Sequence, residues 1–161
     1  STVVMFGGLL AASNNNALKE AVIPTVIDGS CMGSFAFAER QSRYEMADVA
    51  TTAVVADGGY RLDGEKTVVS NGGSANKFVV SARTSGGQFG HQGVSLFLVD
   101  AAADGVSVKS YKTMDGQRAA TVTLANVVPP INELAVGPDM ELASSPCSDG
   151  STGGSIWPFP Y

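Results

Sequence analysis

The sequence predicts a mainly β domain with a short helical segment in front of it, and three observations support this fold class. Between Phe35 and Pro130, runs of β-branched and aromatic residues alternate with turn signals about every eight to twelve residues, as in β-sandwiches and β-barrels. Of the 161 residues, 19 are glycine, which indicates many turns, and 44% are hydrophobic, which is enough for one core. Helical signals are confined to the first thirty residues.

The predicted helix covers Ala17 to Ile23. Three asparagines, Asn14 to Asn16, lie at its start and can accept hydrogen bonds from the free amides of its first turn. Pro24 has no amide hydrogen, so we expect it to end the helix. We therefore divide the chain into a helical segment, residues 1–29, a β domain, residues 30–135, and an irregular tail, residues 136–161.

Two turn signals predict hairpins in the first half of the β domain. Asp63-Gly64 tolerates the positive φ angles of a two-residue primed turn and lies between two short β-type runs. The run Thr51–Ala56 is closed by Asp57-Gly58-Gly59, and Asn71-Gly72-Gly73 leads into a further strand, Lys77–Ala82. These signals predict a meander of neighbouring antiparallel strands.

The second half of the β domain contains the clearest strand signals. The predicted elements are the strands Val94–Val99, Val106–Tyr111 and Ala119–Val128, the turns Ala101–Gly105 and Asp115-Gly116, and the long loop Thr84–Gly93. After residue 130 the alternation ends. Proline and glycine then interrupt every stretch that is long enough for a helix, which predicts the irregular tail.

Composition argues against several classes of function. The net charge of −5 and the pI near 4.7 argue against nucleic acid as the main partner, because phosphate neutralisation needs clustered Lys and Arg. Cys31 and Cys147 lack the spacing of a zinc site or a disulfide framework, which favours a cytoplasmic setting. The apolar residues 2–12 are too few to cross a bilayer, so we expect no membrane partner. His91 has no catalytic or metal-binding partner at a recognisable spacing, and we expect it to be an exposed loop residue.

From Tyr60 to Thr84 the sequence reads YRLDGEKTVVSNGGSANKFVVSART. It resembles the middle domain of acyl-CoA dehydrogenases, where G-Y-x-L-x-G-x-K-x-x-x-(S/T)-N-G precedes A-x-x-F-V-V-x-A-R-T. Upstream, Leu18 to Glu39 resembles the family's passage from its N-terminal helices into F-A-x-(T/S)-E; downstream, GVSLFLVD, GVSVKSY and DGQRAATVTLANVVPP resemble its next strands in order. The resemblance covers roughly residues 17–135, and a series of motifs in order is far more specific than one glycine motif.

The resemblance implies a middle domain built as a small antiparallel β-barrel or a pair of crossed sheets, with residues 1–29 as the remnant of a helical N-terminal domain. It also implies FAD as cofactor and dehydrogenation of an acyl-CoA thioester to a 2-enoyl-CoA. The implied partners are the acyl-CoA substrate and an electron-transfer flavoprotein, and the parent enzyme is expected to be a homo- or hetero-oligomer. The family's catalytic base comes from its C-terminal domain, so we expect no catalytic residue here and no activity of this chain alone.

Two segments correspond to the family's flavin-contacting segments. The cofactor-binding residues that the resemblance implies are Phe35, Ala36, Phe37, Ala38 and Glu39 in the first segment and Val68, Val69 and Ser70 in the second. Backbone amides can bind the flavin whatever the side chains are, and Ser70 keeps the hydroxyl that the family places near the ring. Two residues depart from the family: Ala38 replaces its Thr or Ser, and Val68 replaces its Trp. For the carboxylates of Glu39 and Glu45 we expect structural roles.

The family's G-S-D sequence is replaced here by Arg43-Tyr44-Glu45, so bulky residues stand where small ones approach FAD pyrophosphate and acyl-CoA. We expect Arg43 and Tyr44 to be substrate-binding, with Arg43 taking over phosphate binding from the missing Ser. The QSRY sequence resembles a divergent branch that includes pimeloyl-CoA dehydrogenase small-subunit-like proteins. This suggests a dicarboxylic, aromatic or otherwise unusual acyl group.

Other readings of the sequence remain open. A non-catalytic β-barrel binding or interaction module would also explain the missing Thr, Trp and Gly-Ser, and an acyl-CoA oxidase or flavin monooxygenase relative would share the domain. The composition of Met140 to Tyr161 is foreign to the amphipathic helix that follows this domain in the family, which suggests a shifted reading frame or a vector-derived end. Because the chain begins with Ser1, we expect it to be internal to a longer protein.

Overall fold

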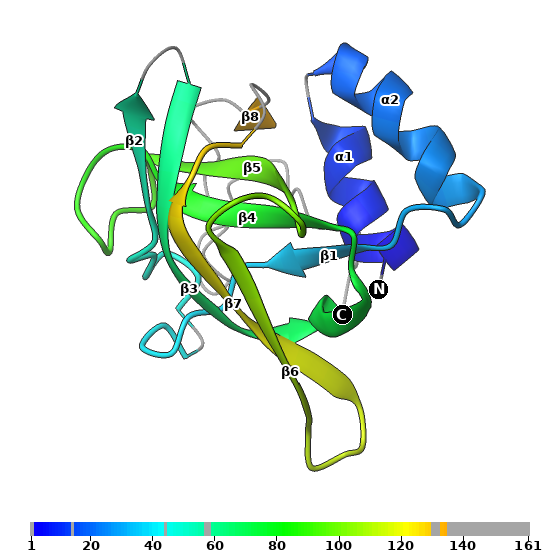
Figure 1. Ribbon diagram of the computed structural model, residues 1–161. Helices are drawn as coiled ribbons and strands as arrows, with labels where there is room; N and C mark the ends of the chain where they lie inside the picture. The colour runs from blue at the N-terminus through cyan, green and yellow to red at the C-terminus, as the bar shows by residue number, and fades with distance from the viewer. Residues whose placement is uncertain (1, 14, 44, 57–58, 130–132, 135–161) are drawn as a thin grey trace, which may run out of the picture.

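The computed structural model describes residues 2–13, 15–43, 45–56, 59–129 and 133–134, so the predicted tail lies outside the described residues. Within them the predicted fold class is confirmed, because a curled, mostly antiparallel sheet makes up most of the molecule and helices cover one of its faces (Figure 1). The strands are β1 (Gly33–Ala36), β2 (Thr52–Ala56), β3 (Gly59–Ser70), β4 (Lys77–Arg83), β5 (Val94–Asp100), β6 (Val106–Lys112), β7 (Arg118–Val127) and β8 (Glu133–Leu134).

The sheet curls because β3 and β4 diverge from each other. The strand order is β6-β7-β3-β2-β4-β5-β8, and β2 meets β4 only where Thr52 pairs with Arg83. At the other end β1 fills the space, since it runs parallel to β4 from Gly33 to Ala36 and also contacts β3. The sheet is therefore a half-barrel that holds β1 and β2 between its two longer arms (Figure 1).

The hairpin predicted at Asp63-Gly64 is wrong. β3 continues through both residues, and its hairpin partner is the preceding strand β2. The pairing of β3 with β7 shifts register between Leu62 and Gly64, which marks a β-bulge. A Cβ atom on Gly64, whose φ is +156°, would lie 2.5 Å from Oγ1 of Thr51, so the glycine serves a close approach of two chain segments.

The predicted meander is also wrong after β3. Residues 71–73 form a turn, as expected, but β3 pairs with β2 and β7, whereas β4 pairs with β1 and β5. The turn carries the chain past the start of β1, where Asn76 donates its amide to the carbonyl of Met32 at 2.7 Å. The other predicted strands, the long loop and both later turns are confirmed to within one residue at either end.

Each side of the half-barrel has a hydrophobic core. The inner core contains Ala36, Ala53, Leu62, Val69, Phe78, Val80, Ala82, Phe97, Val99, Val122, Leu124 and Val127. The outer core lies between the sheet and the helices and contains Phe6, Leu10, Leu18, Val22, Val26, Cys31, Val79, Leu96 and Leu98. Residues of β4 and β5 alternate between the two cores, so these strands are buried on both faces and anchor the whole fold.

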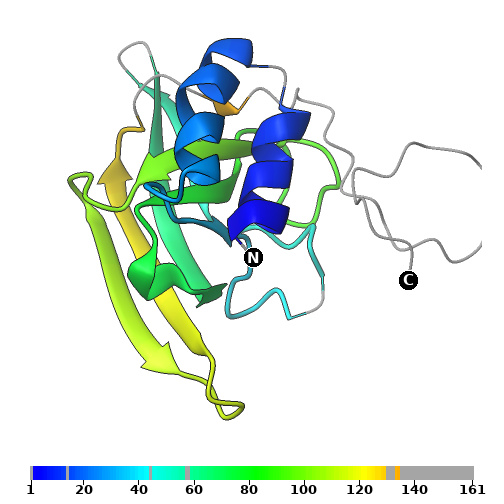
Figure 2. The same cartoon turned by 90° about the vertical axis from the view of Figure 1, so that its right-hand side faces the viewer.

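The helices cover the outer face of β4 and β5 (Figure 2). A π-helical segment, Thr2–Gly7, continues directly into α1 (Gly8–Ala12), and α2 (Asn16–Ile27) follows. The sequence did not predict the first of these helices, because two adjacent glycines disfavour a helix there. Complete burial of Phe6 and Leu10 in the outer core outweighs that cost.

The prediction for α2 is correct at its start and wrong at its end. The side chain of Asn15 caps the helix by accepting the amide of Leu18 at 3.0 Å. Pro24 lies inside the helix and does not end it. Pro24 has no amide hydrogen to donate to the carbonyl of Glu20, four residues before it. Both residues are exposed, so water can solvate this carbonyl and the helix continues.

Candidate functional site

The two predicted flavin segments lie side by side, although they are about thirty residues apart in the sequence. The carbonyl of Ala38 accepts the amide of Thr67 at 2.8 Å, and the hydroxyl of Ser34 donates to the carbonyl of Ser70 at 2.8 Å. The end of β1 and the end of β3 therefore form one continuous strip of the molecule.

The strip has an apolar outer surface with a hydroxyl at its edge. The rings of Phe35 and Phe37 stack with their centroids 4.9 Å apart, and both side chains are half-buried. Val68 is 58% exposed and has a φ of +53°, an unusual value for a β-branched residue. Its amide donates to the hydroxyl of Tyr111 at 3.1 Å, and the Ser70 side chain is exposed.

Three of the predicted cofactor-binding residues turn their side chains inward. Ala36 and Val69 belong to the inner core. Glu39 is 5% exposed, and its carboxylate accepts hydrogen bonds from Thr51 and Lys66. These three residues can therefore reach a ligand only through their main-chain atoms. The side chains of Val68 and Ser70 are exposed, whereas Phe35 and Phe37 are half-buried and Phe35 packs against the outer core.

The Glu39 carboxylate is the centre of a buried polar network. Oε1 accepts hydrogen bonds from Nζ of Lys66 at 2.6 Å and from the hydroxyl and amide of Thr51 at 2.6 and 3.0 Å. Oε2 accepts from the side-chain amide of Gln41 at 2.6 Å and from the Ala50 amide at 2.8 Å. The expected structural role of Glu39 is thereby confirmed, since it ties the loop after β1 to the start of β2.

Lys66 is fully buried on β3 and donates, besides its bond to Glu39, to Oγ of Ser81 at 3.0 Å and to the Phe37 carbonyl at 3.5 Å. Burial lowers the pKa of Lys66 to about 8, although the negative charge of Glu39 opposes this shift. Burial raises the pKa of Glu39, but the charge and hydrogen bond of Lys66, with the bonds from Thr51 and Gln41, outweigh burial and hold it at about 2. The network therefore holds the first flavin segment rigidly against β3.

Arg83 organises the loops at the other end of β4. Its side chain is 8% exposed, and its guanidinium donates to the backbone carbonyls of Ala47, Val49, Ser85, Gln88, Gly90 and Gln92 at 2.8 to 3.5 Å. Nη2 contacts three of these carbonyls with two hydrogens, so one hydrogen is shared, and the planar fork of five donors makes an arrangement that a lysine could not reproduce. This single residue thus joins the loop before β2 to the loop between β4 and β5.

The predicted substrate-binding loop follows Glu39. Arg43 is exposed and has a φ of +48°, while Tyr44 lies outside the described residues. Arg40 lies 3.6 Å from Glu65 in an exposed ion pair. The carboxylate of Glu45 accepts the amide of Ala47 at 3.0 Å, as expected for a structural carboxylate.

Sequence reasoning missed Lys66 and Arg83 as organising residues. Lys66 carried a signal, because it occupies an inward position of a strand, where an unpaired charge is costly. Arg83 carried none besides its place in the A-R-T motif. Among the described residues, no three His, Cys, Asp or Glu side chains are placed to hold a metal ion. His91 is exposed in its loop, as expected.

No helix in the described part of the chain is long and apolar enough to cross a membrane.

The curled sheet with its helical cover defines a mostly β domain, and sequence comparison establishes its family. The family model "Acyl-CoA dehydrogenase, middle domain" matches residues 34–127, more than half of the chain. The chain therefore belongs to the acyl-CoA dehydrogenase family, as its middle domain.

Individual relatives agree with this assignment. An acyl-CoA dehydrogenase of Bacillus subtilis is 34% identical over 94 residues, which are 58% of this chain and 24% of the relative. Cyclohexane-1-carbonyl-CoA dehydrogenase of Geobacter metallireducens is 31% identical over 109 residues, 68% of this chain and 28% of the relative. The chain thus spans about a quarter of the length of these two relatives.

Solved structures show the same fold. A probable acyl-CoA dehydrogenase from Mycobacterium abscessus matches with a TM-score of 0.72 and 27% identity, over 78% of this chain and 34% of that one. Butyryl-CoA dehydrogenase from Megasphaera elsdenii matches with a TM-score of 0.76 and 24% identity, over 82% of this chain and 36% of that one.

Proposed function

We propose that this domain forms one wall of the FAD and acyl-CoA site of an enzyme that converts an acyl-CoA thioester to a 2-enoyl-CoA. One observation carries the proposal. The two segments that the family resemblance assigns to the flavin are adjacent in space, joined by the Thr67–Ala38 and Ser34–Ser70 hydrogen bonds. Their adjacency is what a shared ligand surface requires, and composition alone does not predict it.

The residues present on this strip fit the isoalloxazine ring of FAD. The ring has apolar faces and a polar edge, and the strip offers apolar surface from Phe35, Phe37 and Val68 with the exposed hydroxyl of Ser70 beside it. When bound, FAD supplies the hydride acceptor. This chain's residues would orient the ring, exclude water from one face and donate hydrogen bonds at the edge. The buried bond of Glu39 to Lys66 would keep the strip in place.

Arg43 is proposed to bind a phosphate of FAD or acyl-CoA. It is exposed, and the three ion pairs found among the described residues do not include it. A guanidinium matches a phosphate with two parallel hydrogen bonds. We further propose that the complete enzyme is an oligomer that passes electrons to an electron-transfer flavoprotein and accepts a dicarboxylic, aromatic or otherwise unusual acyl group.

The complete enzyme that contains this domain provides the test. Loaded with FAD and mixed without oxygen with straight, branched, dicarboxylic and aromatic acyl-CoA thioesters, it should lose its oxidised flavin absorbance with one of them and form the matching 2-enoyl-CoA. Flavin that stays oxidised with every thioester would refute the proposed reaction.

A variant pair tests the role of Arg43. Arg43→Ala should weaken acyl-CoA or FAD binding about tenfold, the effect of losing one charge-assisted hydrogen bond. Arg61→Ala removes the same charge from an exposed position on β3 and should leave both affinities unchanged. Equal affinities in the Arg43→Ala variant and the parent would exclude the phosphate role.

A further inference from the structure

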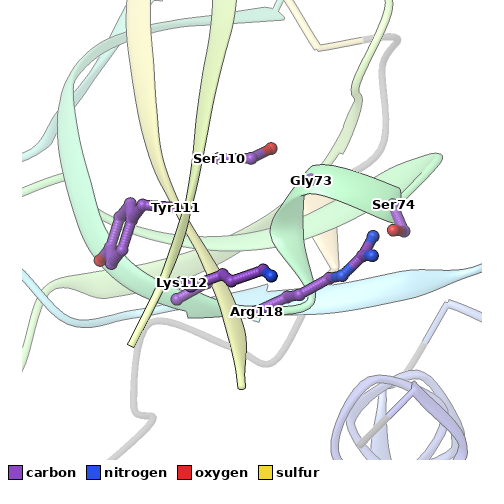
Figure 3. A pocket seen from close by; sticks show the side chains of 7 residues that line it. Gly73, Ser74, Ser110, Tyr111, Lys112 and Arg118 are labelled. Atoms are coloured by element: carbon purple, nitrogen blue, oxygen red, sulfur yellow. The ribbon is translucent and has the colours of Figure 1, made fainter. Parts of the chain in front are cut away.

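A second candidate site lies between the turn after β3 and the β6–β7 hairpin. It is a cleft of about 240 Å³, lined by Gly73, Ser74, Ser110, Tyr111, Lys112, Arg118 and Ala119 (Figure 3). None of these residues belongs to the predicted flavin segments or to the Arg43 loop. A cleft of this volume has room for a small polyatomic anion.

The walls of the cleft are held in place by direct contacts. The amide of Asn71 donates to the carbonyl of Arg118 at 2.9 Å, which fixes the turn to β7. A Cβ atom on Gly73 would lie 2.0 Å from Oγ of Ser110, so only glycine lets the turn approach β6 this closely. The cleft is therefore a built feature of the fold.

Two cations face each other at one edge of the cleft. Lys112 and Arg118 are directly opposite in the register of β6 and β7, a placement that is unfavourable for like charges. The three ion pairs found in the described part of the chain include neither residue. Asp115, in the turn between them, instead accepts hydrogen bonds from the Thr113 hydroxyl and the Gln117 amide.

The polar groups that line the cleft suit an anion. Figure 3 shows Lys112 and Arg118 extending toward the side where Ser74 lies, whereas Tyr111 points away from them. The ammonium and the guanidinium only donate hydrogen bonds, and the hydroxyls of Ser74 and Ser110 can donate too. Only 10 of the 161 residues are Lys or Arg, so two of them facing each other beside two hydroxyls are a local exception in an acidic chain.

We propose that this cleft binds a diphosphate group. Two cations on adjacent strands can each contact one phosphoryl group, and the guanidinium can do so with two parallel bonds. The proposal is independent of the proposed dehydrogenation, because its first probes are pyrophosphate and simple nucleotides.

The test is calorimetric titration of the full 161-residue chain with inorganic pyrophosphate, ADP and AMP. Pyrophosphate and ADP should bind saturably, AMP at least about tenfold more weakly than ADP, and added salt should weaken all three. No saturable binding, or equal affinities for ADP and AMP, would overturn the proposal.

Variants at exposed positions locate the site. Lys112→Gln and Arg118→Gln should each weaken pyrophosphate binding at least about tenfold, and Ser110→Ala a few-fold. Lys109→Gln removes the same charge from the opposite face of β6 and should have no effect. Equal weakening by Lys109→Gln would mean that general surface charge attracts the anion, and the site would be rejected.

Competition with FAD and coenzyme A then identifies the nucleotide, since both molecules contain an ADP unit. Displacement of ADP by FAD alone assigns the cleft to the flavin nucleotide, and displacement by coenzyme A alone assigns it to the acyl carrier. Displacement by neither identifies a free nucleoside diphosphate as the ligand. A failed dehydrogenation assay would leave each of these results unchanged.

Discussion

Removing the positive charge of Lys66 should destabilise the domain by about 3 kcal/mol. The Lys66 side chain is fully buried and its Glu39 partner is 3% exposed, so Lys66→Met leaves a carboxylate without its counter-charge inside the protein. Breaking a buried pair from one side typically costs about 3–5 kcal/mol. We expect the lower end, because Thr51, Ala50 and Gln41 still donate to the carboxylate.

The same variant should change how stability depends on pH. The pKa of Glu39 is about 2 in the folded chain and ordinarily 4.5, so its ionised form stabilises the fold above about pH 4.5. That contribution, about 3 kcal/mol from the difference in pKa, is lost as the pH falls toward 2. Without Lys66, burial dominates and the pKa of Glu39 rises. Protonation of Glu39 then no longer costs stability, so the variant should lack the parent's loss of stability between about pH 4.5 and 2, and the gap between the two should narrow as the pH falls.

Urea unfolding of the full chain at several pH values measures both effects. Lys77→Met is the matched control, because its ion pair with Asp100 is partly exposed and should be worth less than about 1 kcal/mol. The double variant Glu39→Gln, Lys66→Met should be less destabilised than the sum of the two single variants, since both lose one interaction. A cost below 1 kcal/mol for Lys66→Met, or an unchanged acid profile, would refute this account of the network.

Three further predictions concern other contacts of the fold. Arg83→Lys should cost about 3 kcal/mol in urea unfolding and speed amide exchange in the loops that it joins; unchanged exchange would show that the loops do not depend on the guanidinium. Gly64→Ala should lower the free energy of unfolding by about 2–4 kcal/mol in the same measurement. Gly59→Ala is the control: its Cβ position has open space around it, so the cost should be less than about 1 kcal/mol. Equal costs would argue against the close approach at the bulge. Tyr111→Phe removes the acceptor of the Val68 amide, so this amide should exchange faster and stability should fall by about 1 kcal/mol; unaltered exchange at Val68 would contradict the hydrogen bond.

Strand positions were predictable because local alternation and turn residues determine them. β4 to β7 appear in the sequence as β-branched runs between glycine-containing turns, and their ends fall within one residue of expectation. Which strands pair is a long-range property. Asp63-Gly64 has the residues of a tight turn, but β7 pairs with β3 on both sides of it and Thr51 packs against the glycine, so a bulge forms instead.

The positions of the candidate site were predictable only through family resemblance. The sequence alone does not show that Ala38 lies beside Thr67, or that Glu39 and Lys66 form a buried pair, because both contacts depend on β1 lying between the diverging strands β3 and β4. The extent of α2 beyond Pro24 likewise depends on the environment, since packing of Val22 and Val26 on the sheet supports a helix that local propensity would end.

The flavin content of the complete enzyme with a charge placed on the apolar strip tests the central claim most directly. Val68→Asp and Val55→Asp make the same change at two exposed valines, 58% and 74% exposed, and only Val68 lies in the predicted flavin segments. We predict that Val68→Asp binds FAD at least about tenfold more weakly, while Val55→Asp keeps the flavin content of the parent. Full flavin content in Val68→Asp would contradict the proposal that this surface forms a wall of the FAD site.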